Sequence, residues 1–382
     1  MKIFFDENMP YAKDFFSDFC KADELIPFSG RDLTAEQVID ADVLLVRSIT
    51  KVNEVLLKNN NKISFVGTAT IGTDHIDQAY LNDRDITFHS APGCNAISVA
   101  EYVISSLVIL AERYQLDLHK LSVGIVGGGN TGTRLSEKLT ALGIDYLICD
   151  PLLEQNQNDS RDFSSLEEVL KCDVISLHVP KTVEGEHPTY HLLDKSKLNN
   201  LKNDQILIST CRGEVIDNKA LLALKEQGHG LKVVLDVWEG EPDVLMPLIE
   251  YTEIATAHIA GYSLEGKARG TEMLYQALCD HIAKQDASSI EYKYQLVNFL
   301  PPANISMIKL NQEFNEVLLN QLVKMVYDVR RDDAIFRQQL ASQGFDNLRK
   351  NYPVRREFSS VQVDLLPNAL SDVPHRLGFN KT

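Results

Sequence analysis

Residues 121–150 constrain the fold of this chain more than any other segment. The apolar run at 123–126 is typical of a buried strand and leads directly into the glycine-rich sequence GGGNTG at 127–132. A helix-compatible stretch follows and ends at Gly143, and a second apolar run then ends at Asp150. This order of strand, glycine loop, helix, strand and acid predicts the beginning of a doubly wound α/β domain with a parallel sheet.

The glycine loop predicts a site for the pyrophosphate of a dinucleotide. Gly127 permits a tight turn, Gly129 lets the backbone approach the pyrophosphate, and Gly132 lets the helix and the strand pack closely. The free N–H groups at the helix start, around Asn130 and Thr131, can bind phosphate oxygens. A glycine-rich turn that binds no nucleotide stays open as the alternative.

Asp150 indicates which dinucleotide binds. Its carboxylate can accept hydrogen bonds from ribose hydroxyls, and its charge would repel a 2′-phosphate, so the sequence favours NAD over NADP. Asp150 is followed by Pro151, and Asp-Pro is a common turn. A simple capping role for Asp150 is therefore the alternative.

Strand-like and helix-like segments alternate along most of the chain. This alternation predicts βαβ units and two doubly wound parallel-sheet domains of Rossmann or flavodoxin type. Long helices are predicted at 96–113 and 263–284. The predicted strands span residues 2–5, 43–46, 63–66, 86–89, 123–126, 146–149, 174–177, 206–209, 233–235 and 254–256.

The pattern changes near residue 289. Segments 295–300 and 359–366 are predicted as strands, and 311–329 is predicted as an amphipathic helix. No further glycine-rich loop follows. Residues 289–382 are therefore predicted to form a separate C-terminal α+β domain.

Composition limits the classes of partner. The chain has 382 residues and a formal net charge of −16, which disfavours nucleic acid and anionic membranes. No apolar stretch is long enough to span a bilayer, and the N-terminal residues do not resemble a secretory signal. The six cysteines form no CxxC pair, which favours reduced thiols, a cytoplasmic location and no bound metal over a disulfide framework or a metal site.

Three short sequences at predicted strand ends carry the residue types that alcohol oxidation needs. These are TCRG at 210–213, DVWEGEP at 236–242 and AHIAGY at 257–262. His258 can accept the hydroxyl proton, Glu241 can orient the imidazole and favour its protonated form, and Arg212 can bind a substrate carboxylate. Taken singly, each has a bland alternative: a structural ion pair for Arg212, a Glu-Pro turn for Glu241 and a core histidine for His258.

Together these motifs resemble the D-isomer-specific 2-hydroxyacid dehydrogenases over about residues 1–288. The resemblance implies an Arg–Glu–His catalytic set at Arg212, Glu241 and His258. It also implies a discontinuous substrate domain of residues 1–95 and 262–288, and an NAD domain of residues 96–261. The implied NAD contacts are Gly127, Gly129, Asn130, Thr131, Gly132, Asp150, Val179, Thr210, Cys211, Arg212, Asp236 and Gly261.

The chain departs from that family in three places. Gly128 replaces a bulkier residue, and Ser209 stands where an asparagine is usual. Val179 stands where a threonine usually offers its hydroxyl to NAD, so only the backbone of Val179 could contribute.

The resemblance to one branch of the family continues into the C-terminal part, through VYDVRRDDAIFR and FDNLRKNYPVRREFSS. It implies a small phosphorylated hydroxy acid as substrate, contacts from Ser48, Thr70 and Tyr262, and a homodimer through residues 289–382. Independently, RSITK at 47–51 follows a strand and offers cations and hydroxyls, which predicts that Arg47 contributes to a phosphate site. A solvated loop is the alternative for this segment. A phosphoglycerate or glyoxylate type of dehydrogenase, or an NADH-sensing adaptor, is the alternative for the whole chain.

Overall fold

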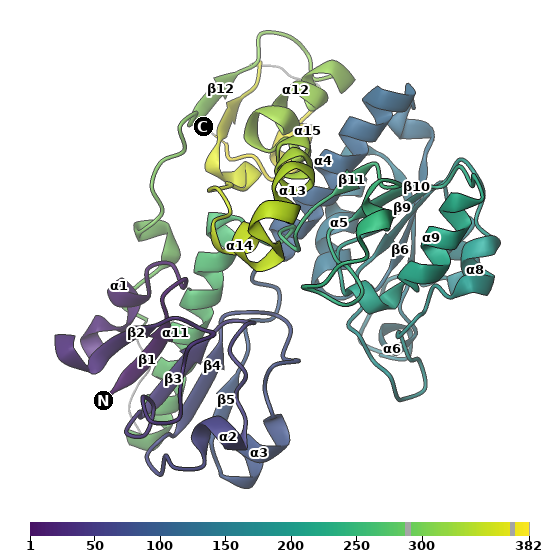
Figure 1. The fold of residues 1–382 in the computed structure, drawn as a ribbon. Coiled ribbons are helices and arrows are strands. Elements are labelled where there is room, and N and C mark those ends of the chain that lie inside the picture. The colour runs from purple at the N-terminus through teal and green to yellow at the C-terminus, as the bar shows by residue number, and fades with distance from the viewer. Residues whose placement is uncertain (287–291, 367–370, 382) are drawn as a thin grey trace. The chain divides into compact units, whose positions relative to one another are not determined.

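The computed structural model describes residues 1–286, 292–366 and 371–381 (Figure 1). The chain folds into two compact units. One comprises Met1–Asn95 and Ser263–Pro301, and the other comprises Ala96–Tyr262 and Pro302–Thr382. The predicted boundary between residues 288 and 289 lies outside the described residues. The division into three domains stays a prediction.

The first unit contains a five-stranded parallel sheet in the order β2-β1-β3-β4-β5. Its central strand β3 (Val43–Val46) is buried along its whole length, as expected when helices cover both faces of a parallel sheet. The edge strand β2 (Leu25–Phe28) was not predicted, because its sequence LIPF contains a proline. The other strands are β1 (Ile3–Asp6), β4 (Phe65–Thr68) and β5 (Thr87–His89).

The longest helix of this unit, α11 (Leu264–Asp286), confirms the helix predicted at 263–284 and packs against β4 and β5. Its Leu274 and Leu278 join the buried cluster that includes Phe15 and Phe65. The shorter helices are α1 (Ala12–Phe16), η1 (Ser17–Phe19), η2 (Ala22–Glu24), α2 (Glu54–Leu57), α3 (Gln78–Asp83) and η5 (Leu296–Asn298).

The second unit contains a six-stranded parallel sheet in the order β11-β10-β9-β8-β6-β7. The first strand of this series, β6 (Ser122–Val126), has β7 on one side and β8 on the other, so the strand order reverses at β6. Ligands of such sheets bind at this reversal, beyond the carboxyl ends of the strands. The other strands are β7 (Asp145–Cys149), β8 (Val174–Leu177), β9 (Ile206–Ser209), β10 (Lys232–Leu235) and β11 (Ile254–Ala255).

Helices flank this sheet. The long helix α4 (Ala96–Tyr114) confirms the prediction at 96–113 and is buried from Ser98 to Ala111. The remaining helices of residues 96–262 are η3 (Leu118–Lys120), α5 (Asn130–Leu142), α6 (Pro151–Glu154), α7 (Leu166–Val169), α8 (Lys195–Asn199), η4 (Gly213–Val215), α9 (Asn218–Glu226) and α10 (Met246–Ile249).

The C-terminal part is α+β, as predicted, but one of its predicted strands is wrong. Residues 295–300 contain η5 instead of a strand, and they belong to the first unit. The predicted strand at 359–366 is real over β13 (Gln362–Asp364), which pairs in parallel with β12 (Met307–Lys309). The helices are α12 (Glu316–Val326), α13 (Val329–Gln343), α14 (Phe345–Lys350), η6 (Phe358–Ser360) and α15 (Val373–Arg376).

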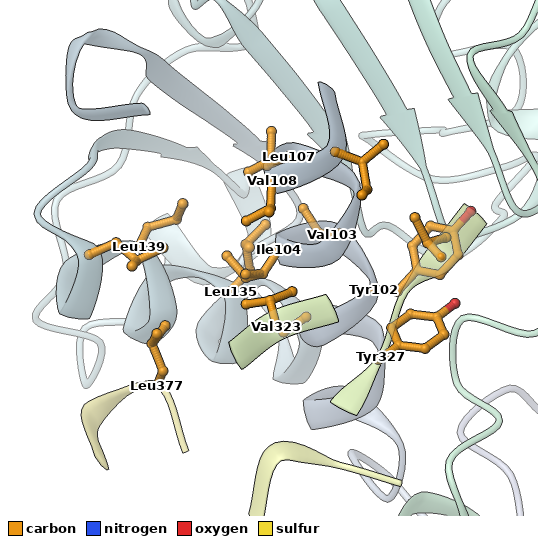
Figure 2. Packing of buried hydrophobic residues seen from close by; sticks show 14 of the residues in the cluster. Tyr102, Val103, Ile104, Leu107, Val108, Leu135, Leu139, Val323, Tyr327 and Leu377 are labelled. Carbon is orange, nitrogen blue, oxygen red and sulfur yellow. The ribbon is translucent and has the colours of Figure 1, made fainter. Parts of the chain in front are cut away.

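The C-terminal part shares a hydrophobic core with residues 96–262 of the same unit. Figure 2 shows Val323 and Leu377 packed beside Ile104 of α4 and Leu139 of α5. A buried Lys138 side chain donates a hydrogen bond of 2.6 Å to the Leu377 carbonyl oxygen. Deletion of this part would therefore uncover the core of the second unit, and truncation is a poor test of its role.

All six cysteines lie in the described part of the chain and carry free thiols. Among the described residues no helix is long and apolar enough to cross a membrane.

Candidate active site

The glycines of the loop after β6 are of two kinds. Gly127 and Gly132 are required by the protein backbone, whereas Gly129 leaves open space for a ligand. A Cβ atom on Gly132 would lie 2.0 Å from the Gly127 carbonyl oxygen, so only glycine fits there. Gly127 has a φ of +100°, and a Cβ atom would lie 2.8 Å from the His178 carbonyl carbon. Above Gly129 a Cβ atom would meet no described atom within 4 Å. This open space fits close approach by a pyrophosphate, so the loop fits NAD.

Helix α5 begins at Asn130, with Gly129 in the capping position and no side chain capping the helix. Asn130, Thr131 and Gly132 therefore form the first turn, where backbone N–H groups lack partners within the helix. The local geometry agrees with the predicted phosphate contact at Asn130 and Thr131, which stays a prediction.

Asp150 fixes the glycine loop and caps a helix at the same time. Its Oδ2 accepts a hydrogen bond from the Gly128 N–H at 2.9 Å, and its Oδ1 accepts one from the Leu153 N–H at 3.1 Å. The alternative capping role is therefore real. Each Asp150 carboxylate oxygen has a second lone pair, so Asp150 can still accept the predicted hydrogen bond from a ribose hydroxyl.

We expect the protein to prefer NAD over NADP by at least about ten-fold in kcat/KM, or ~1.4 kcal/mol. The reason is the Asp150 carboxylate beside the glycine loop, which would repel a 2′-phosphate. Steady-state kinetics with both cofactors measure the ratio, and Asp150→Asn should narrow it. Equal kcat/KM values for the two cofactors in the wild-type protein would contradict a contact between Asp150 and the cofactor ribose.

The three predicted catalytic residues follow three neighbouring strands. Arg212 follows β9, Glu241 follows β10 and His258 follows β11, and these strands lie side by side in the sheet. The loops after β9 and β10 touch, since a Cβ atom on Gly213 would lie 1.9 Å from the Trp238 carbonyl carbon. The carboxyl edge of the sheet therefore gathers all three motifs.

Glu241 and His258 form the predicted pair. His258 Nδ1 lies 2.8 Å from Glu241 Oε2, and Glu241 Oε1 accepts a hydrogen bond of 2.8 Å from the Trp238 N–H. Burial alone would raise the pKa of Glu241, but its contacts with His258, the Trp238 N–H and the charge of Arg349 together lower it. An ionised Glu241 accepts a hydrogen bond from the His258 Nδ1–H, which leaves His258 Nε2 as the available base.

Asp236 has a role that the sequence did not reveal. Its carboxylate accepts hydrogen bonds from the Thr256 hydroxyl at 2.6 Å, the Ile259 N–H at 2.7 Å and the Ala260 N–H at 2.9 Å. The His258 N–H donates to the Asp236 backbone oxygen at 2.7 Å. These bonds hold His258 at a φ of 56°, a conformation that non-glycine residues seldom adopt. The predicted contact of Asp236 with NAD stays a prediction.

Gly261 directly follows Ala260, whose N–H donates to Asp236, and its predicted contact with NAD stays a prediction. Two other predicted cofactor residues, Val179 and Thr210, adjoin His178. Its Nε2 lies 2.8 Å from the Ser176 hydroxyl, and its Nδ1 lies 3.2 Å from the hydroxyl of Thr210. Val179 follows His178 directly, and the Cys211 carbonyl oxygen accepts a hydrogen bond of 2.9 Å from the Arg212 guanidinium. The Thr210 hydroxyl is thus engaged within the protein, and the predicted NAD contacts of Val179, Thr210, Cys211 and Arg212 stay predictions.

Burial lowers the pKa of His178 to about 3. The folded state therefore keeps this ring neutral, whereas the unfolded chain protonates it below about pH 6.5. Stability from this group is complete above pH 6.5 and is lost as the pH falls towards 3. The residue is only partly covered, so we expect a loss of about 1 kcal/mol between pH 8 and pH 5.

Denaturant unfolding at both pH values measures this loss, with His178→Gln as the comparison. Glutamine keeps polar atoms for Ser176 and Thr210 but does not titrate. The variant should therefore lose less stability on acidification than the wild-type protein. An identical pH dependence in both proteins would contradict a neutral His178.

The first unit carries the other predicted substrate residues. Arg47 follows β3 and donates to the Asn8 carbonyl oxygen at 3.5 Å, and Ser48 beside it is exposed. Thr70 follows β4, and its hydroxyl lies 2.8 Å from that of Thr68.

Lys267 of α11 is a further candidate for this site that was not predicted. Burial, and then the charge of Arg47, lower the pKa of Lys267 to about 8, so the two cations are neighbours.

One group in the described part of the chain has the donor set of a metal site. It consists of His191, Asp217 and Glu239, whose ligand atoms lie within 4.8 Å of one another. His191 Nε2 lies 2.7 Å from Glu239 Oε1, and Asp217 caps α9. These contacts account for all three side chains as supports of the loop that leads to Glu241.

Comparison with known proteins decides the family. Residues 108–260 match the NAD-binding domain of the D-isomer specific 2-hydroxyacid dehydrogenases, and residues 299–378 match a domain of unknown function. Erythronate-4-phosphate dehydrogenase of Colwellia psychrerythraea is 70% identical over all of both chains. The enzyme of the same name from Tolumonas auensis is 52% identical, covering all of this chain and 99% of its own. The chain belongs to the erythronate-4-phosphate dehydrogenase family.

Solved structures agree with this assignment. D-lactate dehydrogenase of Aquifex aeolicus, solved with NAD and lactic acid, is 25% identical with a TM-score of 0.60, covering 75% of this chain and 96% of its own. The 3-phosphoglycerate dehydrogenase of Entamoeba histolytica, at 22% identity and a TM-score of 0.62, shares the fold. As a member of the erythronate-4-phosphate dehydrogenase family, the protein is an NAD-dependent dehydrogenase. The predicted fold class, enzyme class and cofactor are confirmed.

Proposed function

We propose that the protein oxidises 4-phospho-D-erythronate to (R)-3-hydroxy-2-oxo-4-phosphooxybutanoate, with reduction of NAD, as a step in pyridoxal 5′-phosphate synthesis. The pairing of His258 with Glu241 at 2.8 Å, in a chain 70% identical to a relative with this name, carries the proposal. NAD, when bound, takes up the hydride from C2 of the acid.

The residues of the chain account for the rest of the chemistry. His258 Nε2 accepts the hydroxyl proton as the C2–O bond becomes a carbonyl, and Glu241 stabilises the imidazolium that results. Arg212 binds the substrate carboxylate and polarises the reacting oxygen. Tyr262, in the segment that carries His258, helps to hold the acid.

The phosphate needs a second anion site. Carboxylate and phosphate stand at opposite ends of a four-carbon acid, and Arg212 serves the carboxylate end. Arg47 and Lys267 in the first unit are neighbouring cations, and together with Ser48 and Thr70 they support a phosphate site there. Two neighbouring cations repel one another, and a bound phosphate would offset that repulsion.

Steady-state oxidation of 4-phospho-D-erythronate and 3-phosphoglycerate with NAD, and reduction of glyoxylate with NADH, test the proposal. We expect kcat/KM to be highest for 4-phospho-D-erythronate by at least about ten-fold. Faster turnover of 3-phosphoglycerate or glyoxylate would instead favour the phosphoglycerate or glyoxylate type of dehydrogenase. Binding of NADH without turnover of any 2-hydroxy acid would favour an NADH-sensing adaptor.

We also propose a cytoplasmic homodimer that assembles through residues 289–382, with the substrate and NAD domains divided as the resemblance implies. The segment 330–356 is rich in arginine and aromatic residues, and this composition, common at interfaces, predicts a subunit contact there. That argument is weakened, because Phe336, Phe345 and Arg355 are buried within the chain. Better support comes from apolar side chains that the C-terminal part exposes, including Val317, Met325 and Val354.

The full chain is expected to sediment with twice its mass of 42.9 kDa. Val317→Glu together with Met325→Glu should shift the population towards monomers, because a buried charge without a partner destabilises an interface. Val55→Glu, at a side chain that is 72% exposed in the first unit, is the matched control and should leave the dimer intact. A wild-type chain that sediments as a monomer would contradict the proposed dimer.

A further inference from the structure

The C-terminal part supports the segment that carries His258 at several points. The Ala255 N–H donates to Asp333 Oδ1 at 2.8 Å, and the Arg355 guanidinium donates to the Ala260 carbonyl oxygen at 2.9 Å. The Phe336 ring stacks on Trp238, with 5.5 Å between ring centroids. Helix α13 thus packs directly against β11, as Figure 1 also shows.

Arg349 in α14 contacts a predicted substrate residue, Tyr262. Its guanidinium lies over the ring of Tyr262, 5.4 Å from the centroid, in the arrangement of a cation–π contact. On another side Tyr262 meets the edge of Tyr352, with ring centroids 5.9 Å apart. The Tyr262 ring is therefore held by two side chains from the C-terminal part.

Acidic groups of the candidate active site act on Arg349. Burial alone would lower the pKa of Arg349, but Tyr262, Glu241 and Asp236 outweigh burial and raise it. In return, the charge of Arg349 helps to keep Glu241 ionised. The Arg349 Nε is buried and makes no hydrogen bond among the described residues, as is also true of Arg355. Arg337 of the same part is placed differently, since it donates to the carbonyl oxygens of Ile249 and Thr252.

We propose that Arg349 is a positioning residue of the active site, which holds the Tyr262 ring for the substrate and supplies positive charge beside the Glu241–His258 pair. The inference rests on the proposed function in that it takes Tyr262 to meet the acid. The C-terminal part would then contribute a residue to the active site in addition to its proposed role in the dimer. The role is positioning rather than chemistry, because Arg349 acts through Tyr262 and Glu241.

The size of the expected effect follows from this role. Arg349→Met leaves Arg212, Glu241 and His258 in place, so the chemistry should remain possible. The substitution should lower kcat/KM for 4-phospho-D-erythronate about ten- to thirty-fold, as expected for losing a cation–π contact and a nearby charge.

Three further measurements separate positioning from general damage. NADH affinity, followed by cofactor fluorescence, should change less than about two-fold. Arg349→Lys should recover much of the lost kcat/KM, because lysine keeps the charge and the cation–π contact. In a double-mutant cycle, Tyr262→Phe combined with Arg349→Met should cost less than the product of the two single effects, as expected for residues that act together.

Arg337→Met is the matched control. It removes an arginine of the same C-terminal part that bonds to the Ile249 and Thr252 carbonyl oxygens, so it should lower the melting temperature and spare kcat/KM. The proposal is overturned if Arg349→Met keeps full activity, if lysine gives no recovery, or if the effects of Arg349 and Tyr262 multiply independently. If the wild-type protein does not oxidise 4-phospho-D-erythronate, the proposed function fails by itself. The cycle is then run on the binding of that acid to the NADH complex, measured by calorimetry.

Discussion

Replacing His258 with alanine is expected to lower kcat by about 10²–10⁴-fold, while the NAD affinity changes less than about two-fold. The variant loses the only base that Glu241 orients, whereas the glycine loop and Asp150 are untouched. Steady-state kinetics at saturating substrate and NAD measure kcat, and competition of NAD against NADH fluorescence measures the NAD affinity.

Two variants make this result specific. Glu241→Gln keeps the shape of the side chain but removes the charge that stabilises the imidazolium, so kcat should fall by a smaller factor, about 10–10³. His119→Ala removes an exposed histidine of the same unit and should leave kcat unchanged. If His258→Ala keeps its activity within a few-fold of the wild-type value, another group accepts the proton.

Much of the second unit could be predicted from local sequence. The apolar runs of β8 and β9 have the predicted bounds because these strands are buried on both faces, and such strands consist of continuous apolar residues. The glycine loop was also predictable, since Gly132 must be glycine because of a backbone contact with nearby Gly127, and Gly127 itself has a positive φ that favours glycine. Local signals of this kind are enough to place the strands, the glycine loop and the following helix along the sequence.

The errors have local causes as well. Residues 295–300 alternate enough to suggest a strand, but the segment packs through Leu296 in the cluster that includes Tyr275, and it pairs with no strand in the described part of the chain. Strand propensity without a partner does not make a sheet. The predicted helix at 311–329 starts only at Glu316, because the Asn315 side chain caps it by accepting a bond from the Leu318 N–H.

Residues that act through distant partners could not be predicted. Asp236 supports the His258 loop through Thr256, Ile259 and Ala260, and no spacing rule marks an acid for that purpose. Lys267 and Arg349 look like ordinary helix surface residues in the sequence. Only folding brings Lys267 near Arg47 and Arg349 over Tyr262, contacts that span long stretches of chain. A charged residue such as Lys267 or Arg349 indicates a functional site only when it is known to be buried.

The pair of Arg47 and Lys267 leads to the second large effect. We expect the wild-type protein to prefer 4-phospho-D-erythronate over D-erythronate by at least about 10²-fold in kcat/KM. Arg47→Ala and Lys267→Ala should each lower kcat/KM for the phosphorylated acid about ten- to a hundred-fold, which is typical of losing one charge-assisted contact. Activity on D-erythronate should hardly change, because that acid has no phosphate to lose.

The pH dependence gives an independent reading of Lys267. Its pKa of about 8 means that the ammonium is charged below pH 8 and neutral above it. KM for the phosphorylated acid should therefore rise as the pH passes about 8, and Lys267→Arg should remove that rise, because arginine stays charged. Lys58→Ala, which alters an exposed lysine of the same unit, is the control and should leave both substrates unaffected. If Arg47→Ala and Lys267→Ala impair the phosphorylated and unphosphorylated acids equally, these cations support the fold, and the phosphate binds to other residues.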